Sequence, residues 1–263
     1  MINQFLLINA NNTNTSFALA NEKRIVGIVK VPTAQVRGIP FAANRYGAVV
    51  LASVVPAATK KLVRLLPVRP LVVSASIDLG VDIAYPRKKQ IGADRLANAV
   101  GVARLYGAPA IVVDFGTAVT FDIVKPSTRH GNFRGKPGSG VRGEYVGGVI
   151  APGLAAVTDY LYQRTALLPR IKIAEPHSVI GKGTVEAMRI GAVIGYRGLV
   201  KEILGALKRQ RGLRKAVVVA TGGYGEFMAR GIPEIQQVNP LLTLEGLRFI
   251  YLRNAKCSFV SSS

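Results

Sequence analysis

Apolar residues near the N-terminus fall into short runs that polar turns separate. Leu6–Ile8 is an apolar run that ends in the polar turn Asn9–Asn14, after which Ser16–Leu19 resumes the apolar pattern. Short apolar runs bounded by Asn-rich turns are typical of strands joined by tight connections. The apolar segment Ile25–Val31 predicts another strand. The chain therefore opens with three predicted strands in succession.

Strands and helices alternate along the rest of the chain. Apolar spacing predicts an amphipathic helix from Ala93 to Tyr106, which Gly107 ends. Strands are also predicted at Ala48–Val55, Leu71–Ser74, Ala110–Val113, Ala118–Val124, Tyr145–Ile150 and Val217–Ala220. Helices are also predicted from Pro56 to about Leu66, from Gly153 to about Gln163, over Thr184–Lys208 as the longest, and near Leu244–Leu252. The Gly-rich, basic residues 125–143 predict a mobile hairpin loop.

One internal similarity sets the predicted architecture. Leu6–Thr13 can be superposed on Ile111–Thr117, because each apolar strand runs into a carboxamide or carboxylate and then a turn with Thr. The chain returns as a strand after both turns. The fold class is therefore predicted as α/β, with two similar halves, residues 1–113 and 114–263, that face each other across a cleft.

Composition and charge narrow the class of protein. The 263 residues are 49% hydrophobic and 19% charged, which is globular and excludes disorder. The single cysteine, Cys257, excludes an internal disulfide and a Cys-rich zinc site. No apolar run reaches about 18 residues, and Met1–Gln4 lacks the basic start of a signal peptide. We expect no membrane segment and a cytoplasmic location.

The net charge of +21, from 35 basic and 14 acidic residues, predicts anionic partners. Nucleic acid, acidic lipid and phosphorylated metabolites all satisfy that expectation. Zinc-finger spacing, aromatic-rich RNA-reading strands and Trp are missing, so nucleic acid is expected to bind only nonspecifically, through charge. The densest basic cluster, Lys208–Lys215, is typical of a hydrated helix end.

Three turns carry candidate phosphate-binding groups. Tight turns expose backbone N–H groups and hydroxyls at one point, as a phosphate requires. Gly116 allows close approach, Asn11 can adopt a left-handed conformation where one is needed, and Asp114 can hold a metal ion or its waters. The third turn is Thr221–Gly223. These turns can equally be ordinary ones, whose Asp and Asn side chains cap their own backbone.

Asp94 is the candidate catalytic carboxylate. It opens a predicted helix in the sequence Gly92-Ala93-Asp94-Arg95. One interpretation is helix capping with a local Arg contact. The other is a general base beside a cation that binds an anionic group of the substrate.

Taken in order, these segments resemble the type III pantothenate kinases. The matching segments are Gly92–Asn98, Asp114–Ala118, Gly147–Gly153, Leu168–Pro169 and Thr221–Gly223, and Asn12–Thr15 and Ser53–Pro56 fit as well. The resemblance covers about residues 5–253. It implies a homodimeric kinase of the acetate and sugar kinase, Hsc70 and actin superfamily, with ATP between two ribonuclease-H-like halves. Such enzymes phosphorylate pantothenate to 4′-phosphopantothenate, the first step of coenzyme A synthesis, and use magnesium and potassium or ammonium.

The resemblance also assigns residues. Asp94 would be the base, and Asp114 would bind the monovalent cation. The other pantothenate ligands would be Tyr85, Gly92, Ala93, Arg95 and, across the dimer interface, Thr184. The ATP ligands would be Asn9, Asn11, Asn12, Thr13, Asn14, Thr15, Gly116, Thr117, Gly222 and Gly223.

The first motif departs from the family pattern Asp-x-Gly-Asn-Thr, because here it reads Asn9-Ala10-Asn11-Asn12-Thr13. Asn9 keeps an oxygen but loses the negative charge that helps to hold magnesium. Asn11 replaces a glycine where a phosphate should approach the backbone. Two functions therefore stay open: an ATP:pantothenate phosphotransferase, or a catalytically impaired relative that binds nucleotide or nucleic acid as an accessory protein.

Overall fold

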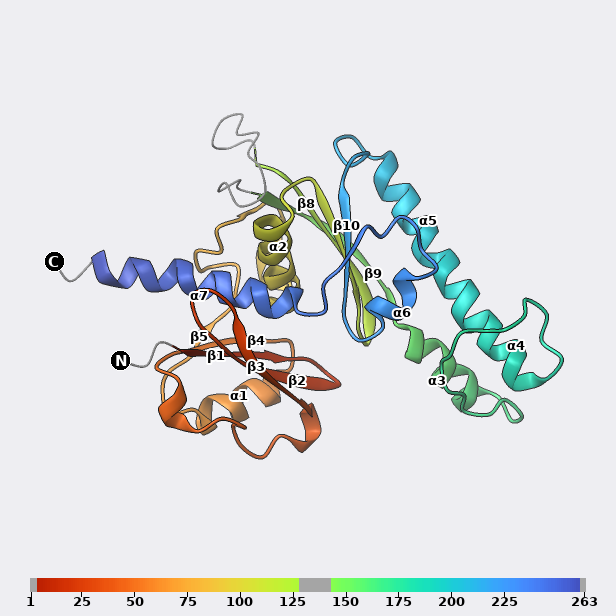
Figure 1. Ribbon diagram of the computed structural model, residues 1–263, viewed down its shortest axis with the longest axis horizontal. Coiled ribbons are helices and arrows are strands. Elements are labelled where there is room, and N and C mark those ends of the chain that lie inside the picture. The colour runs from red at the N-terminus through yellow and green to blue at the C-terminus, as the bar shows by residue number, and fades with distance from the viewer. Residues whose placement is uncertain (1–3, 128–142, 261–263) are drawn as a thin grey trace. The chain divides into compact units, whose positions relative to one another are not determined.

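The computed structural model (Figure 1) describes residues 4–127 and 143–260. The chain divides into two compact units, each built from separate stretches of sequence. Unit 1 comprises Met1–Ala108, Ile123–Gly147 and Leu241–Ser263, and unit 2 comprises Pro109–Asp122 and Gly148–Pro240. These units interleave along the chain, whereas the sequence suggested one boundary after residue 113. The division into halves at that residue, with a nucleotide cleft between them, stays a prediction.

The first sheet has five strands in the order β3-β2-β1-β4-β5. Its strands are β1 (Phe5–Ala10), β2 (Asn14–Ala20), β3 (Ile25–Pro32), β4 (Val49–Ser53) and β5 (Leu71–Val72). Strand β1 runs antiparallel to β2 and parallel to β4, and β4 runs parallel to β5. All six residues of β1 are buried, as expected for the central strand.

The second sheet has six strands in the order β11-β10-β7-β8-β9-β6. Its strands are β6 (Asp82–Ile83), β7 (Ala110–Phe115), β8 (Ala118–Pro126), β9 (Gly143–Pro152), β10 (Val217–Thr221) and β11 (Gln237–Val238). Strand β10 runs parallel to both β7 and β11. Counted from β7, the order β9-β8-β7-β10-β11 repeats that of the first sheet, and β6 is added at the edge. The predicted α/β fold with two similar halves is confirmed.

The helices of unit 1 fix the start of α2 (Ala93–Leu105), which carries Asp94. Helix α1 (Pro56–Leu65) follows β4, and α7 (Leu242–Val260) is longer than the sequence predicted. A Cβ on Gly101 would lie 2.6 Å from the carbonyl oxygen of Leu242, so α2 and α7 approach at backbone distance. The Thr243 hydroxyl donates a buried hydrogen bond of 2.7 Å to Asn98 Oδ1. Packing and hydrogen bonding therefore hold α2 in a single position within unit 1.

The helices of unit 2 are α3 (Leu154–Arg164), α4 (Thr184–Ile190), α5 (Tyr196–Arg209) and α6 (Gly225–Ala229). A π-helical turn, Gly191–Gly195, joins α4 to α5, so the long helix predicted from Thr184 is present with one irregular turn. Short 3₁₀ turns occur at Thr33–Gln35, Ala43–Arg45 and Lys88–Gln90. The centre of the predicted loop 125–143 lies outside the described residues. None of the described helices is both long enough and apolar enough to span a bilayer.

Candidate functional site

Asp94 lies in the first turn of α2 with its carboxylate folded back against the preceding glycine. The Arg95 N–H donates a hydrogen bond of 2.8 Å to Asp94 Oδ1. A Cβ on Gly92 would lie 2.5 Å from that oxygen and 3.3 Å from Cγ1 of Val54. Since a real Cβ essentially never approaches an oxygen so closely, any side chain at position 92 would move the Asp94 carboxylate out of this position.

The surroundings of Asp94 make its carboxylate a better base. Burial raises the pKa of the Asp94 carboxyl, while the N–H and the charge of Arg95 act in the opposite direction. The helix N-cap is Gly92, which has no side chain, so Asp94 is not the capping residue itself. A carboxylate with a raised pKa beside a cation is the arrangement that proton abstraction from a hydroxyl requires.

Tyr85 and Arg95, both predicted substrate ligands, meet at a third residue. The Arg95 guanidinium carbon lies 5.9 Å from the centroid of the Tyr145 ring, within range of a cation–π interaction. The Tyr85 and Tyr145 ring centroids are 6.3 Å apart. Gly147 has a φ of +126°, and a Cβ there would lie 3.6 Å from the Tyr85 ring. The sequence did not single out Tyr145, whose only signal was an aromatic residue just before the Gly147-Gly148 pair.

Strand β1 and the turn after it contain two buried carboxamide oxygens, one on Asn9 and one on Asn11. Asn9 is only 8% exposed, and neither Asn9 Oδ1 nor Asn11 Oδ1 has a hydrogen-bond partner. Buried polar atoms almost always have a hydrogen-bond partner, so two buried acceptors without one, two residues apart, indicate a place for a donor or a cation. Hard cations prefer such oxygens, and the residues therefore fit a magnesium ion or its waters.

The backbone of the turn after β1 does not need a left-handed residue at position 11. Every described residue with positive φ is a glycine, so Asn11 does not adopt a left-handed conformation. The Asn11 N–H donates to the Asn14 carbonyl at 3.0 Å. The Thr15 and Thr33 hydroxyls lie 3.0 Å apart, and Thr33 in turn donates to the Asn11 carbonyl at 2.6 Å. Thr15 is thus buried within the sheet and braces the turn.

Asp114, near the end of β7, lies beside glycines from the turns that follow β7 and β10. A Cβ on Gly222 would lie 2.5 Å from Asp114 Oδ1 and 2.7 Å from the Phe115 backbone nitrogen. Gly222 also has a φ of +85°, and a Cβ on Gly116 would lie 3.8 Å from Asp114 Oδ1. Nothing lies within 4 Å of the Cβ position of Gly223. Three predicted residues, Asp114, Gly116 and Gly222, therefore lie together, and binding of the monovalent cation by Asp114 stays a prediction.

Gly153 explains part of the motif Gly147–Gly153. A Cβ at this position would lie 2.6 Å from the Gly116 carbonyl oxygen and would overlap the carbonyl of Thr117. The start of α3 therefore packs directly on the turn that carries both predicted nucleotide ligands. A plain strand-to-helix connection would not need this close approach.

Comparison with known proteins assigns the chain to a family. The family model described as type III pantothenate kinase matches residues 5–136 and 140–206. A type III pantothenate kinase of Akkermansia muciniphila is 49% identical over 250 residues, covering 93% of this chain and 96% of the relative. That of Methylacidiphilum infernorum is 39% identical over 250 residues, covering 93% and 87%. The chain belongs to the type III pantothenate kinase family.

A solved structure supports the fold of this pantothenate kinase family member. A putative Baf family transcriptional activator from Campylobacter jejuni aligns with a TM-score of 0.59 at 20% identity, covering 95% of this chain and 99% of that one. At this identity the likeness shows the shared fold alone.

Thr184, the remaining predicted pantothenate ligand, is exposed at the start of α4 in unit 2. The Lys182 N–H donates to Glu186 Oε2 at 2.9 Å, and a Cβ on Gly181 would lie 2.5 Å from the Ala187 nitrogen. These contacts fix the turn that presents Thr184. Asp94 and the other predicted pantothenate ligands belong to unit 1, so the contact of Thr184 with substrate stays a prediction.

Proposed function

We propose that this chain transfers the γ-phosphoryl group of ATP to the primary hydroxyl of pantothenate, which yields 4′-phosphopantothenate and ADP. The observation that carries the proposal is the glycine-backed carboxylate of Asp94 with its raised pKa. It lies in the motif Gly92–Arg95 of a chain that belongs to a pantothenate kinase family. The names of the curated relatives support the same activity.

Unit 1 supplies the acceptor side of the reaction. As the pantothenate hydroxyl oxygen bonds to the γ-phosphorus, the bond from that phosphorus to the β–γ bridging oxygen breaks. The hydroxyl proton passes to the Asp94 carboxylate. Arg95, held over the Tyr145 ring, binds the carboxylate of pantothenate, and Tyr85, Gly92 and Ala93 line the same site. Phosphoryl transfer depends chiefly on such positioning and on charge neutralisation.

Turns in both units supply the phosphate-binding groups. Gly223 has open space beside its backbone, so a phosphate can approach its N–H closely. Gly116, Thr117 and Gly222 form the turns next to Asp114. In the first sheet the nucleotide ligands are Asn9 and the turn residues 11–14, whereas Thr15 stabilises that turn from within the sheet.

Two cation sites accompany the nucleotide in this proposal. Asn9 Oδ1 and Asn11 Oδ1 would hold magnesium or its waters, and Asp114 would hold potassium or ammonium. Bound cations neutralise the charge of the phosphates during transfer. No group of three or more His, Cys, Asp or Glu side chains among residues 4–127 and 143–260 could form a metal site. Phosphate and water oxygens would therefore complete both coordination shells, and a neutral amide at position 9 implies a higher magnesium requirement than a carboxylate would.

A homodimer is part of the proposal. Large apolar side chains are exposed in unit 2, which also carries Thr184: Ile150 is 63% exposed, Leu167 90%, Val179 77% and Ile180 72%. Monomeric proteins rarely expose so many apolar side chains in neighbouring segments. A second copy of the chain, covering these residues and approaching Thr184, would account for them. The enzyme would act in the cytoplasm.

The test is formation of phosphopantothenate by the purified protein with ATP, magnesium, and potassium or ammonium. Turnover is expected, together with a second-order loss of activity on dilution if the dimer completes the site. No turnover at high ATP, combined with salt-sensitive DNA binding, would instead favour the accessory-protein alternative, which no comparison supports.

A further inference from the structure

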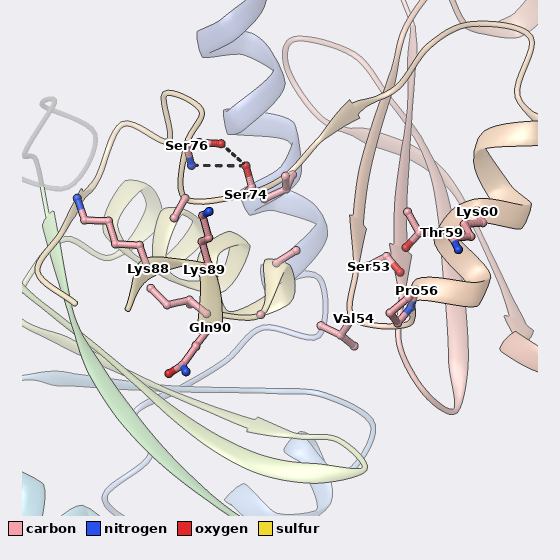
Figure 2. A pocket seen from close by; sticks show the side chains of 15 residues that line it. Ser53, Val54, Pro56, Thr59, Lys60, Ser74, Ser76, Lys88, Lys89 and Gln90 are labelled. Atoms are coloured by element: carbon pink, nitrogen blue, oxygen red, sulfur yellow. Dashed lines mark hydrogen bonds between the residues drawn. The ribbon is translucent and has the colours of Figure 1, made fainter. Parts of the chain in front are cut away.

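Unit 1 contains an open pocket of about 960 Å³ that adjoins the proposed pantothenate site at Gly92 and Ala93, whereas the rest of its lining has no role in the proposed reaction. Figure 2 shows its two walls. Lys60 lies on one wall, with the end of β4 and the start of α1, and Lys88 and Lys89 lie on the other, with Ser74 and Ser76. Of the predicted site residues only Gly92 and Ala93 line the pocket, and no predicted nucleotide ligand does.

The three lysines of the pocket have no acidic partner in the described part of the chain. Lys60, Lys88 and Lys89 are exposed, and none of the lining residues is acidic. Among the described residues no carboxylate forms an ion pair with any of these three lysines. Three ammonium groups around one hollow raise the local concentration of anions.

Two further features of the pocket favour anionic oxygens. The first residues of α1 and α2, Pro56 and Ala93, both line it, and a helix N-terminus attracts negative charge. The Ser74 and Ser76 hydroxyls lie 2.8 Å apart on one wall and provide hydrogen-bonding groups (Figure 2). The lysines and the helix N-termini would repel a cationic ligand.

The positive region continues beyond the pocket. A second hollow of about 530 Å³ along α1 is lined by Lys60, Lys61 and Arg64, so Lys60 belongs to both. The main pocket alone is at the upper end of the range, about 300–1,000 Å³, that small-molecule sites occupy. A single phosphate would fill only a small part of it.

We propose that this pocket binds a small molecule carrying two or more phosphate groups. The lysines would each pair with a phosphate oxygen, and the Ser74–Ser76 pair would hydrogen-bond to the same ligand. Those phosphates can come from the nucleotide of the kinase reaction or from a separate phosphorylated metabolite. The inference does not depend on the proposed reaction, because it concerns binding and not turnover.

Binding of inorganic tripolyphosphate, measured by calorimetry, tests the proposal. The pocket variant is Lys88→Glu with Lys89→Glu. The matched control is Arg214→Glu with Lys215→Glu, which makes the same change in net charge at exposed residues of unit 2. We expect the affinity to fall by about tenfold or more in the pocket variant and by less than about twofold in the control, because the control residues do not line the pocket and exposed charges are screened. Circular dichroism verifies that both variants fold.

Equal losses in the two variants would show that only net charge matters and would overturn the proposal, as would unchanged affinity in the pocket variant. A variant with Lys60→Ala should lose affinity as well. Repeating the titration with a saturating non-hydrolysable ATP analogue separates the two sources of phosphate. Lysine-dependent binding that the analogue abolishes identifies the nucleotide as the ligand, and binding that survives identifies a separate metabolite. Since neither readout involves pantothenate, an inactive enzyme would not affect the outcome.

Discussion

The two sheets share a strand order but differ in the residue at the end of the central strand. Asn9 and Asp114 are each the fifth residue of a six-residue strand. Asn9 is buried in register with Ser16 and Ala52, and its Oδ1 has no hydrogen-bond partner. Asp114 instead lies against Gly222, whose missing Cβ leaves room for the carboxylate. At this position, therefore, only the second sheet carries a negatively charged residue.

The candidate carboxylate of unit 1 is Asp94, at the start of α2, and it too has a glycine beside it. Asp94 lies against Gly92 as Asp114 lies against Gly222, and in each pair the Cβ position is 2.5 Å from a carboxylate oxygen. A charged side chain needs a defined position to act on a substrate or cation, and a glycine neighbour supplies it. The two candidate carboxylates, Asp94 and Asp114, therefore share a glycine neighbour that leaves room for them.

Among changes to the residues around the candidate carboxylates, the largest effect is expected from removing the space behind Asp94. Gly92→Ala would displace the carboxylate, and a base misplaced by about 1 Å can lower kcat by about 100-fold. Gly38→Ala is the matched control, because nothing lies within 4 Å of the Cβ position at that exposed glycine. Steady-state kinetics of both variants decide the matter. Equal rates in the two variants would contradict the claim that Gly92 positions the Asp94 carboxylate for catalysis.

The next largest effect is expected from giving the end of β7 the same uncharged residue that β1 has at this position. Asp114→Asn removes the charge while keeping the shape, so the potassium or ammonium concentration for half-maximal activity should rise by about 10–100-fold. Titrations with each cation at saturating ATP measure this change. An unchanged cation dependence would mean that Asp114 only stabilises its turn.

The reverse change, Asn9→Asp, should make the first turn resemble the second. A carboxylate attracts magnesium more strongly than an amide does, so the magnesium requirement should fall by about two- to tenfold. A buried charge without a cation is costly, so the variant should also unfold at a lower temperature when magnesium is absent. Thermal unfolding with and without magnesium and ATP tests both effects. If magnesium has no influence on the variant, Asn9 only completes its turn.

The smallest effect is expected at Asn11. Its φ is not positive, so the turn does not need glycine, and Asn11→Gly should cost only about 0.5–1 kcal/mol of stability through chain entropy. At saturating magnesium the KM for ATP should change by less than about twofold, on the order of 0.4 kcal/mol, because Asn9 Oδ1 and the phosphate and water oxygens would still hold the cation. A large gain in ATP affinity would show that the asparagine side chain obstructs a phosphate.

Much of the fold was predictable because its strands are short apolar runs between polar turns. The similarity of Leu6–Thr13 to Ile111–Thr117 correctly indicated two sheets with one topology. The two-residue strands β6 and β11 could not be predicted, since pairing with neighbours defines them and not their own sequence. The interleaved units were also invisible, because they depend on α7 packing against α2.

The polar residues of the candidate site could be predicted from the sequence, but the residues that hold them in position could not. Asp94 and Asp114 stood out because carboxylates are scarce in a chain of net charge +21. Gly92, Gly116 and Gly222 appeared in motifs, yet their contact with a carboxylate oxygen depends on the folded geometry. Tyr145, which holds Arg95, could not be identified, since a buried aromatic residue in a strand is typical of any core.

The central claim is that Asp94 accepts the proton of the pantothenate hydroxyl. Because burial raises the pKa of this carboxyl, kcat/KM for pantothenate should rise with pH through a value above the ordinary 3.9 or so of Asp. Burial disfavours the ionised form of Asp94. Its contribution to the stability of the fold is therefore full below the ordinary pKa of the unfolded chain, and it is lost as pH rises through the raised pKa of the folded protein. Asp94→Asn should therefore unfold at an equal or higher temperature at neutral pH.

The most direct test measures kcat and the Kd for pantothenate in the Asp94→Asn variant at neutral pH. Loss of the base should lower kcat by about 100- to 10,000-fold while the Kd changes little, because Arg95, Tyr85 and the site around them stay in place. Unfolding temperature verifies that the variant is folded. Turnover close to that of the unmodified enzyme, with the same Kd, would contradict the assignment of Asp94 as the base.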